Sequence, residues 1–151
     1  RLDYIALGMM AYLLLFGITL WHSPLLHYDN FTHWATIVKF FHINNALPTQ
    51  QDTIISYYTY PVGSSLFIYF FTTIVGFSEG SMLVGQFFLI ASSLYAMFAA
   101  LRDDRRVLMV SMIFASFAVV NTFNVAIRLN NLPVDFLRPA LALAAIADCF
   151  V

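Results

Sequence analysis

Charge is scarce in this sequence. Only 10% of the 151 residues are charged, whereas charged residues make up about a quarter of a typical soluble domain. The formal net charge of -1 provides no basic surface for nucleic acid. The single cysteine, Cys149, excludes an internal disulfide and says nothing about the redox compartment. Apolar residues reach 61%, and the mean hydropathy of +0.80 predicts a chain that lies in a lipid bilayer.

The apolar residues fall into long segments at 4–21, 81–101, 107–127 and 136–151. The first has about the 20 residues that a helix needs to span hydrocarbon, with Tyr4 and Trp21 at its two interfaces. It is too long and too bulky for a cleaved signal peptide. The chain begins without Met and ends inside an apolar run, so we expect the N-terminal part of one transmembrane domain of a longer protein.

Between the first two spans lie a polar stretch, residues 22–60, and a shorter apolar segment, residues 61–77, which Pro61 and Gly63 open. The spacing of Phe31, Trp34, Ile37, Val38 and Phe41 predicts an interfacial amphipathic helix in this region. The predicted fold is therefore an all-α integral membrane protein. It is a multi-pass helical bundle with a large first external loop that contains interfacial amphipathic helices.

The topology depends on whether residues 61–77 cross the membrane. The run "RDDRR", residues 102–106, is the most positive short loop, and such loops tend to be cytoplasmic. If 61–77 crossed, this run would be external. If 61–77 lies on the outer surface or is re-entrant, the run is cytoplasmic. Arg1 suggests a cytoplasmic N-terminus, which makes residues 22–60 external in both alternatives. The charge bias favours the second alternative.

That topology brings the polar clusters "HYDNFTHW" (27–34), "QQDTIISYYTYP" (50–61) and "RLNNLPVDFLR" (128–138) to one face of the membrane. In the first cluster, Asp29 has two interpretations. It is a helix N-cap, or it is a carboxylate that removes a proton from an acceptor hydroxyl. His33 lies four positions later, one helical turn away. His27, Asp29 and His33 also offer imidazole and carboxylate groups that suit a divalent metal, although their spacing matches no metal motif.

The third cluster has the same two kinds of interpretation. Asp135 is either an acid favoured by the dipole at a helix start or a second acid of a site. Arg128 and Arg138 flank it, and they either extend toward lipid headgroups or hold a phosphate through the planar guanidinium.

These motifs resemble the GT-C superfamily of integral-membrane glycosyltransferases, which includes protein O-mannosyltransferases and lipid A aminoarabinose transferases. The matching stretches are "YDNFTHW", "YPVGSSLFIYFF", "GFSEG" and "LPVDF". The first two most resemble bacterial, largely Gram-positive members that lack a characterised function. Asn30 stands where the family often has the second acid of a pair. No glutamate precedes Pro61, where the aminoarabinose transferases bind a metal, so the resemblance carries no metal site and leaves the cofactor open.

The resemblance implies transfer of a sugar from a polyprenyl-phosphate donor to a glycan, lipid or protein acceptor at the outer face of the plasma membrane. It implies that Asp29 is the catalytic acid/base residue and that Asp135 is the candidate for a second acid. From its position one turn after Asp29, we further expect His33 to help orient Asp29 or the substrate. Arg128, Arg138 and Lys39 are the candidates for binding the donor phosphate.

A different class remains open at this point: a transporter, a flippase or a non-catalytic membrane subunit. Transporters carry ionisable residues in the middle of their spans and have broken helices. Here the middles of 4–21, 81–101 and 107–127 hold no charge, and charge gathers at the ends of the segments. This distribution favours a site at the membrane surface over a conduction path.

Overall fold

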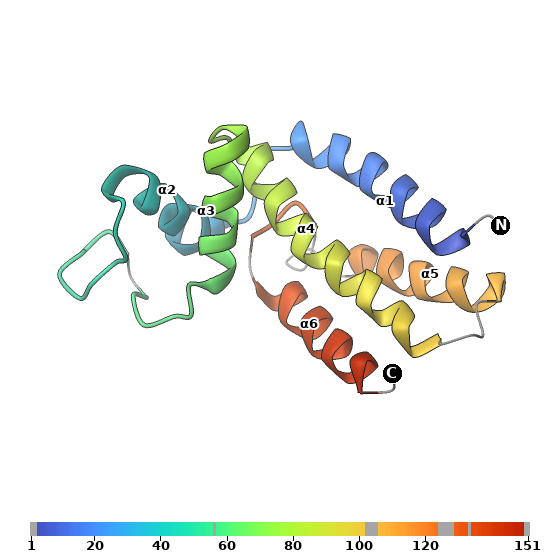
Figure 1. The fold of residues 1–151 in the computed structure, drawn as a ribbon. Coiled ribbons are helices and arrows are strands. Elements are labelled where there is room, and N and C mark those ends of the chain that lie inside the picture. The colour runs from blue at the N-terminus through green and yellow to red at the C-terminus, as the bar shows by residue number, and fades with distance from the viewer. Residues whose placement is uncertain (1–2, 56, 102–105, 124–128, 133, 150–151) are drawn as a thin grey trace.

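The computed structural model describes residues 3–55, 57–101, 106–123, 129–132 and 134–149, and the described part of the chain is helical without strands. The α-helices are α1 (Tyr4–Trp21), α2 (Ala35–Asn44), α3 (Gly63–Val75), α4 (Glu79–Met97), α5 (Val107–Phe123) and α6 (Val134–Asp148). A π-helix, η1 (Asn30–Trp34), precedes α2, and a 3-10 helix, η2 (Phe98–Leu101), follows α4. Figure 1 shows α2 and α3 grouped at one end of the bundle that α1, α4, α5 and α6 form.

Among the described helices, α1 and α4 are long and apolar enough to cross a membrane. They differ in their surroundings. One side of α1 leaves large apolar side chains exposed, among them Leu7, Leu14 and Ile18. Most of α4 is buried, because α1, α3 and α6 all pack against it. Helix α4 is therefore the centre of the bundle, and α1 presents an apolar surface that suits lipid.

The end of α1 meets the beginning of α4. Gly80 lies so close to Trp21 that a Cβ atom there would overlap the Trp21 carbonyl oxygen. A carboxylate oxygen of Glu79 accepts a hydrogen bond of 2.8 Å from the backbone N–H of Leu25. Ser78 caps α4 by accepting from the N–H of Ser81, which starts the helix two residues before the predicted span. Helices α1 and α4 are thus antiparallel neighbours, and residues 22–78 begin and end at the same end of this pair.

Helix α3 packs beside the N-terminal half of α4, where Phe71 and Phe88 lie with their ring centroids 5.4 Å apart. Its buried face holds Ser65, Ile68 and Thr72. If α1 and α4 both cross a bilayer, the two ends of residues 22–78 lie on the same side, and α3 cannot be a single crossing. The interfacial or re-entrant assignment of residues 61–77 stays a prediction.

Helix α5 covers the predicted span as far as Phe123, and residues 124–128 lie outside the described part. Helix α6 has 15 residues, begins at Val134 and contains Pro139. Phe114 of α5 contacts the rings of Tyr12 and Phe98, while α6 packs along α4 and reaches η2.

Candidate functional site

The polar clusters of the sequence meet at one end of the bundle, and Asn30 is the residue that joins two of them. Its side chain is fully buried. Its Oδ1 accepts a hydrogen bond of 2.9 Å from the backbone N–H of Leu132, and its Nδ2 approaches Oδ1 of Asn131 at 3.5 Å. Gln86 of α4 donates to the carbonyl oxygen of Asn131 at 2.9 Å. The segment before α2, helix α4 and the segment before α6 are therefore connected by buried amides, which we call the amide joint (Asn30, Gln86, Asn131 and Leu132).

The segment next to this joint is a π-helix rather than the predicted start of an α-helix. A π-helix is rare, occurs mostly as a single turn and is frequent at functional sites. In η1 it turns Asn30, His33 and Trp34 inward, and the Thr36 hydroxyl donates to the carbonyl oxygen of Phe31 at 2.6 Å.

Asp29 precedes η1 and makes no side-chain capping hydrogen bond. Its side chain is 39% exposed, with Oδ2 lying 3.4 Å from Nδ1 of His27. The same His27 nitrogen lies 3.3 Å from the backbone nitrogen of Asp29, whose N–H it accepts. One Nδ1 cannot both accept that N–H and donate a proton to the carboxylate. Because the side chain of Asp29 is 39% exposed, its carboxylate is accessible. The capping interpretation has no side-chain hydrogen bond to support it.

His33 is 3% exposed, and neither of its ring nitrogens has a hydrogen-bond partner. Three aromatic rings stand edge-on to it, with centroids 4.7 Å away for Trp34, 5.7 Å for Tyr57 and 5.2 Å for Tyr60. Burial lowers the pKa of His33, and the negative charge of Asp29 acts in the opposite direction. His33 thus interacts with Asp29 electrostatically and makes no hydrogen bond to it. Its predicted role in orienting Asp29 or the substrate stays a prediction.

The candidate metal ligands do not assemble. Among the residues that the structure describes, no three His, Cys, Asp or Glu side chains are placed to hold a metal ion. This holds for His27, Asp29 and His33, because the His33 nitrogens are buried beneath aromatic rings.

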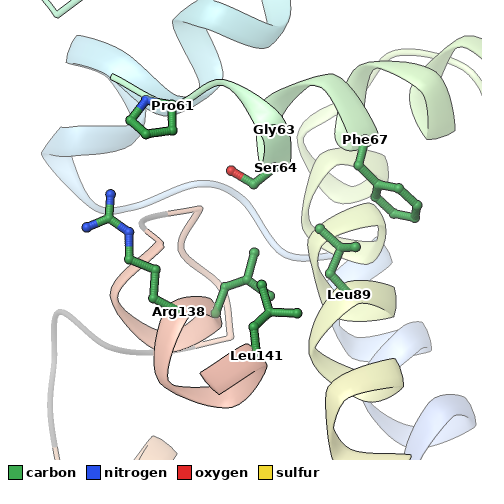
Figure 2. Close-up of a pocket in the computed structure, with 8 residues that line it drawn as sticks. Pro61, Gly63, Ser64, Phe67, Leu89, Arg138 and Leu141 are labelled. Atoms are coloured by element: carbon green, nitrogen blue, oxygen red, sulfur yellow. The ribbon is translucent and has the colours of Figure 1, made fainter. Parts of the chain in front are cut away.

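A cavity of about 330 Å³ lies between the start of α3, α4 and α6. Figure 2 shows the Arg138 side chain extending from α6 toward Pro61, with Ser64 also facing the cavity. The remaining lining is mostly apolar and comes from Gly63, Phe67, Leu89, Leu137 and Leu141. The cavity therefore combines an apolar wall with a guanidinium group.

The other candidate residues, Asp135, Lys39 and Arg128, are placed differently. Asp135 is exposed in the first turn of α6, where an acid is favoured by the helix dipole. Lys39 is exposed on α2 and does not line the cavity. Arg128 lies outside the described residues.

Two features escaped the sequence-based predictions. One is the amide joint, since Asn30 was noted only as a departure from an acidic pair. The other is the contact of Tyr57 and Tyr60 with His33, for which the tyrosine-rich run "YYTY" at 57–60 was the available signal.

Compared with known protein families, curated protein sequences and solved structures, the chain shows no match. The GT-C resemblance therefore depends on the short motifs and remains a prediction.

Proposed function

We propose that the chain is part of a multi-pass membrane glycosyltransferase of the GT-C type. In this proposal it transfers a sugar from a polyprenyl-phosphate donor to an acceptor at the outer face of the plasma membrane. The main supporting observation is the cavity with Arg138, because a polyprenyl phosphate needs both an apolar wall and a cation. Asp29 and this cavity lie at the same end of the bundle, connected through the amide joint and through the contact between His33 and Tyr60.

The surface around the site suits a membrane interface. Leu66, Phe70 and Ile74 lie one helical turn apart along α3, and all three are exposed. Such an apolar stripe fits a helix that lies in the boundary between headgroups and hydrocarbon. A lipid-linked donor held in the membrane would then enter beside α3.

The reaction assigns a task to each group. The carboxylate of Asp29 removes the proton from an acceptor hydroxyl. The acceptor oxygen forms a bond to the anomeric carbon of the donor sugar, and the bond from that carbon to the phosphate oxygen breaks. The electron pair stays on the departing lipid phosphate, and the guanidinium of Arg138 stabilises its added negative charge. His33 is buried beside Asp29 and interacts with its carboxylate electrostatically, without a hydrogen bond.

The test uses the full-length protein in lipid nanodiscs with polyprenyl-phosphate donors that carry radiolabelled sugars. We expect label to move from the donor to a water-soluble or lipid acceptor. Arg138→Ala should weaken donor binding roughly tenfold or more, since a charge-assisted bond to phosphate is lost. Arg138→Lys should restore it only in part, because lysine lacks the bidentate fork.

Lys39→Ala serves as the matched control, because Lys39 is exposed away from the cavity and its loss should leave donor binding unchanged. Movement of the intact donor across the bilayer without sugar transfer would instead identify a flippase. Unaltered donor affinity in Arg138→Ala would leave the cavity without a phosphate-binding role.

A further inference from the structure

Tyr57 and Tyr60 form a stacked aromatic pair at the surface, which we call the tyrosine pair. Their ring centroids are 4.9 Å apart and their planes differ by 18°. Tyr57 is 50% exposed and Tyr60 is 44% exposed. Aromatic rings contribute large apolar contact areas, and exposed apolar surface marks binding sites when it gathers in one place.

The pair is supported from below. Both rings meet the edge-on ring of His33 at 76°, and Trp34 lies 6.4 Å from Tyr60. His33 and Trp34 are buried in η1. The tyrosines are therefore held in place before any ligand arrives, which reduces the entropy lost on binding.

The pair also lies between the two ends of the proposed site. Tyr60 contacts His33, which is one helical turn from Asp29. The residue after Tyr60 is Pro61, which lines the cavity with Arg138. Tyr60 thus contacts the segment that carries Asp29 and directly precedes a residue of the cavity lining.

We propose that the tyrosine pair binds a pyranose ring. A pyranose presents C–H groups on its faces and hydroxyls around its rim. The C–H groups can lie against the electron-rich face of a tyrosine, while the rim hydroxyls stay free for water, the phenol groups and the Asp29 carboxylate. The inference rests on the proposed function for the reason a sugar would be present, but the binding itself requires no transfer. The ring belongs to the donor sugar or to a glycan acceptor, and the experiment below separates these sources.

The first experiment needs no variant. The full-length protein in nanodiscs is exposed to hydroxyl radicals with methyl β-D-glucopyranoside, and oxidation of each tyrosine is followed by mass spectrometry. Sorbitol is the matched blank, since it has hydroxyls but no rigid ring face. A small ligand on an open surface should bind in the millimolar range. At a concentration near its dissociation constant, oxidation of Tyr57 and Tyr60 should fall about twofold relative to sorbitol.

Tyr28 and Tyr58 are internal controls, because they are exposed and should be oxidised equally in both solutions. Equal oxidation of Tyr57 and Tyr60 in glucoside and sorbitol would overturn the proposal. It would leave the pair as interfacial aromatics that contact headgroups.

Variants then test the aromatic faces. Tyr57→Phe with Tyr60→Phe keeps both faces and should bind methyl β-D-glucopyranoside with the wild-type affinity, measured by ligand-detected saturation-transfer NMR on the full-length protein in nanodiscs. Tyr57→Leu with Tyr60→Leu keeps apolar bulk without a flat face and should weaken sugar binding roughly tenfold. Equal binding by the Phe and Leu pairs would overturn the proposal.

Transfer kinetics identify the source of the ring. In the Leu pair, a raised KM for the donor alone would mean that the transferred sugar lies on the tyrosines. A raised KM for the acceptor alone would mean an acceptor glycan, and no change in either would overturn the role in transfer. Asp29→Asn should still show tyrosine protection, because it removes the base and not the platform. Protection without transfer in the wild type would therefore disprove the glycosyltransferase proposal while leaving the sugar-binding site intact.

Discussion

Asp29 and Asn30 are neighbours in the chain, but their side chains lie in opposite surroundings. Asp29 is partly exposed without a capping hydrogen bond, whereas Asn30 is fully buried and bonds to residues about a hundred positions later. His33 and His42 differ in the same way. Both have aromatic rings edge-on to them, but Nε2 of His42 bonds to the Thr72 hydroxyl at 2.8 Å, while the His33 nitrogens have no partner.

The comparison separates two kinds of polar residue. Asn30 and His42 hold elements together, and their hydrogen-bonding groups are used within the fold. The Asp29 carboxylate is partly exposed beside His27, and His33 keeps two buried ring nitrogens without hydrogen-bond partners. An unsatisfied buried polar group costs roughly 1–3 kcal/mol, so its presence in a packed helix end requires a reason, and functional sites commonly supply one. We therefore expect variants of Asn30 and His42 to change stability, and variants of Asp29 and His33 to change activity.

The largest expected effect is at Asp29. Asp29→Asn keeps the shape and the hydrogen-bonding oxygen but cannot take up a proton, so turnover should fall roughly 100-fold or more. Its melting temperature should stay at the wild-type value, because the side chain caps no helix. Sugar transfer and thermal unfolding in detergent measure the two quantities.

Asp148→Asn is the matched control, since Asp148 is exposed at the far end of α6, and both of its measurements should match the wild type. Full turnover in Asp29→Asn would remove the distinction between Asp29 and Asn30 and place the chemistry elsewhere.

The next effect is on stability. Asn30→Ala removes the acceptor for the buried N–H of Leu132, and leaving that group unsatisfied should cost about 2 kcal/mol. Asn44→Ala is the comparison, because Asn44 is exposed and bonds only to a carbonyl oxygen in its own helix. Its change should stay within about 0.5 kcal/mol. Denaturant titration of both variants gives the free energies, and equal values would mean that the amide joint adds nothing.

The same contrast shows how far sequence reasoning reaches. Hydropathy located α1 and the start of α4 to within about two residues, and the positive run "RDDRR" led to the polar clusters being placed together, as their contacts at Asn30 and His33 now show. These are properties of long segments or of whole loops. The motifs also pointed to Asp29 and His33.

The features that sequence reasoning missed depend on single long-range contacts. The bond from Asn30 to Leu132 joins residues 102 positions apart, and an asparagine in a loop gives no sign of such a partner. The π-helix at 30–34 carries no pattern that distinguishes it from an α-helix. The cavity needs side chains from three helices at once, so Arg138 could be named from its charge, but its apolar surroundings could not.

A smaller effect separates the two histidines. His42→Phe removes one hydrogen bond and should cost about 1 kcal/mol, with turnover unchanged; the Thr72 hydroxyl still bonds to the Ile68 carbonyl oxygen. His33→Phe replaces a buried ring without partners, so it should leave stability unchanged or raise it. Its turnover should fall roughly tenfold, less than for the base itself because its role is indirect. His42→Phe should thus lower stability alone, and His33→Phe should lower turnover alone. The same effect in both variants would contradict the distinction between the two histidines.

The smallest effect is the pH dependence of stability that His33 contributes. Its folded-state pKa is lowered from the ordinary 6.5, first by burial, so the folded state binds fewer protons than the unfolded state just below pH 6.5. Above that pH the His33 imidazole is neutral in both states, so its burial carries no cost of protonation. As the pH falls below 6.5, the unfolded chain gains a proton that the folded chain resists, and stability decreases until the folded-state pKa is reached. The melting temperature measured from about pH 7.5 to about pH 5 should therefore decline more steeply for the wild type than for His33→Phe. Identical declines would show that burial does not lower the pKa of His33, and its placement as a buried, neutral imidazole beside Asp29 would lose its support.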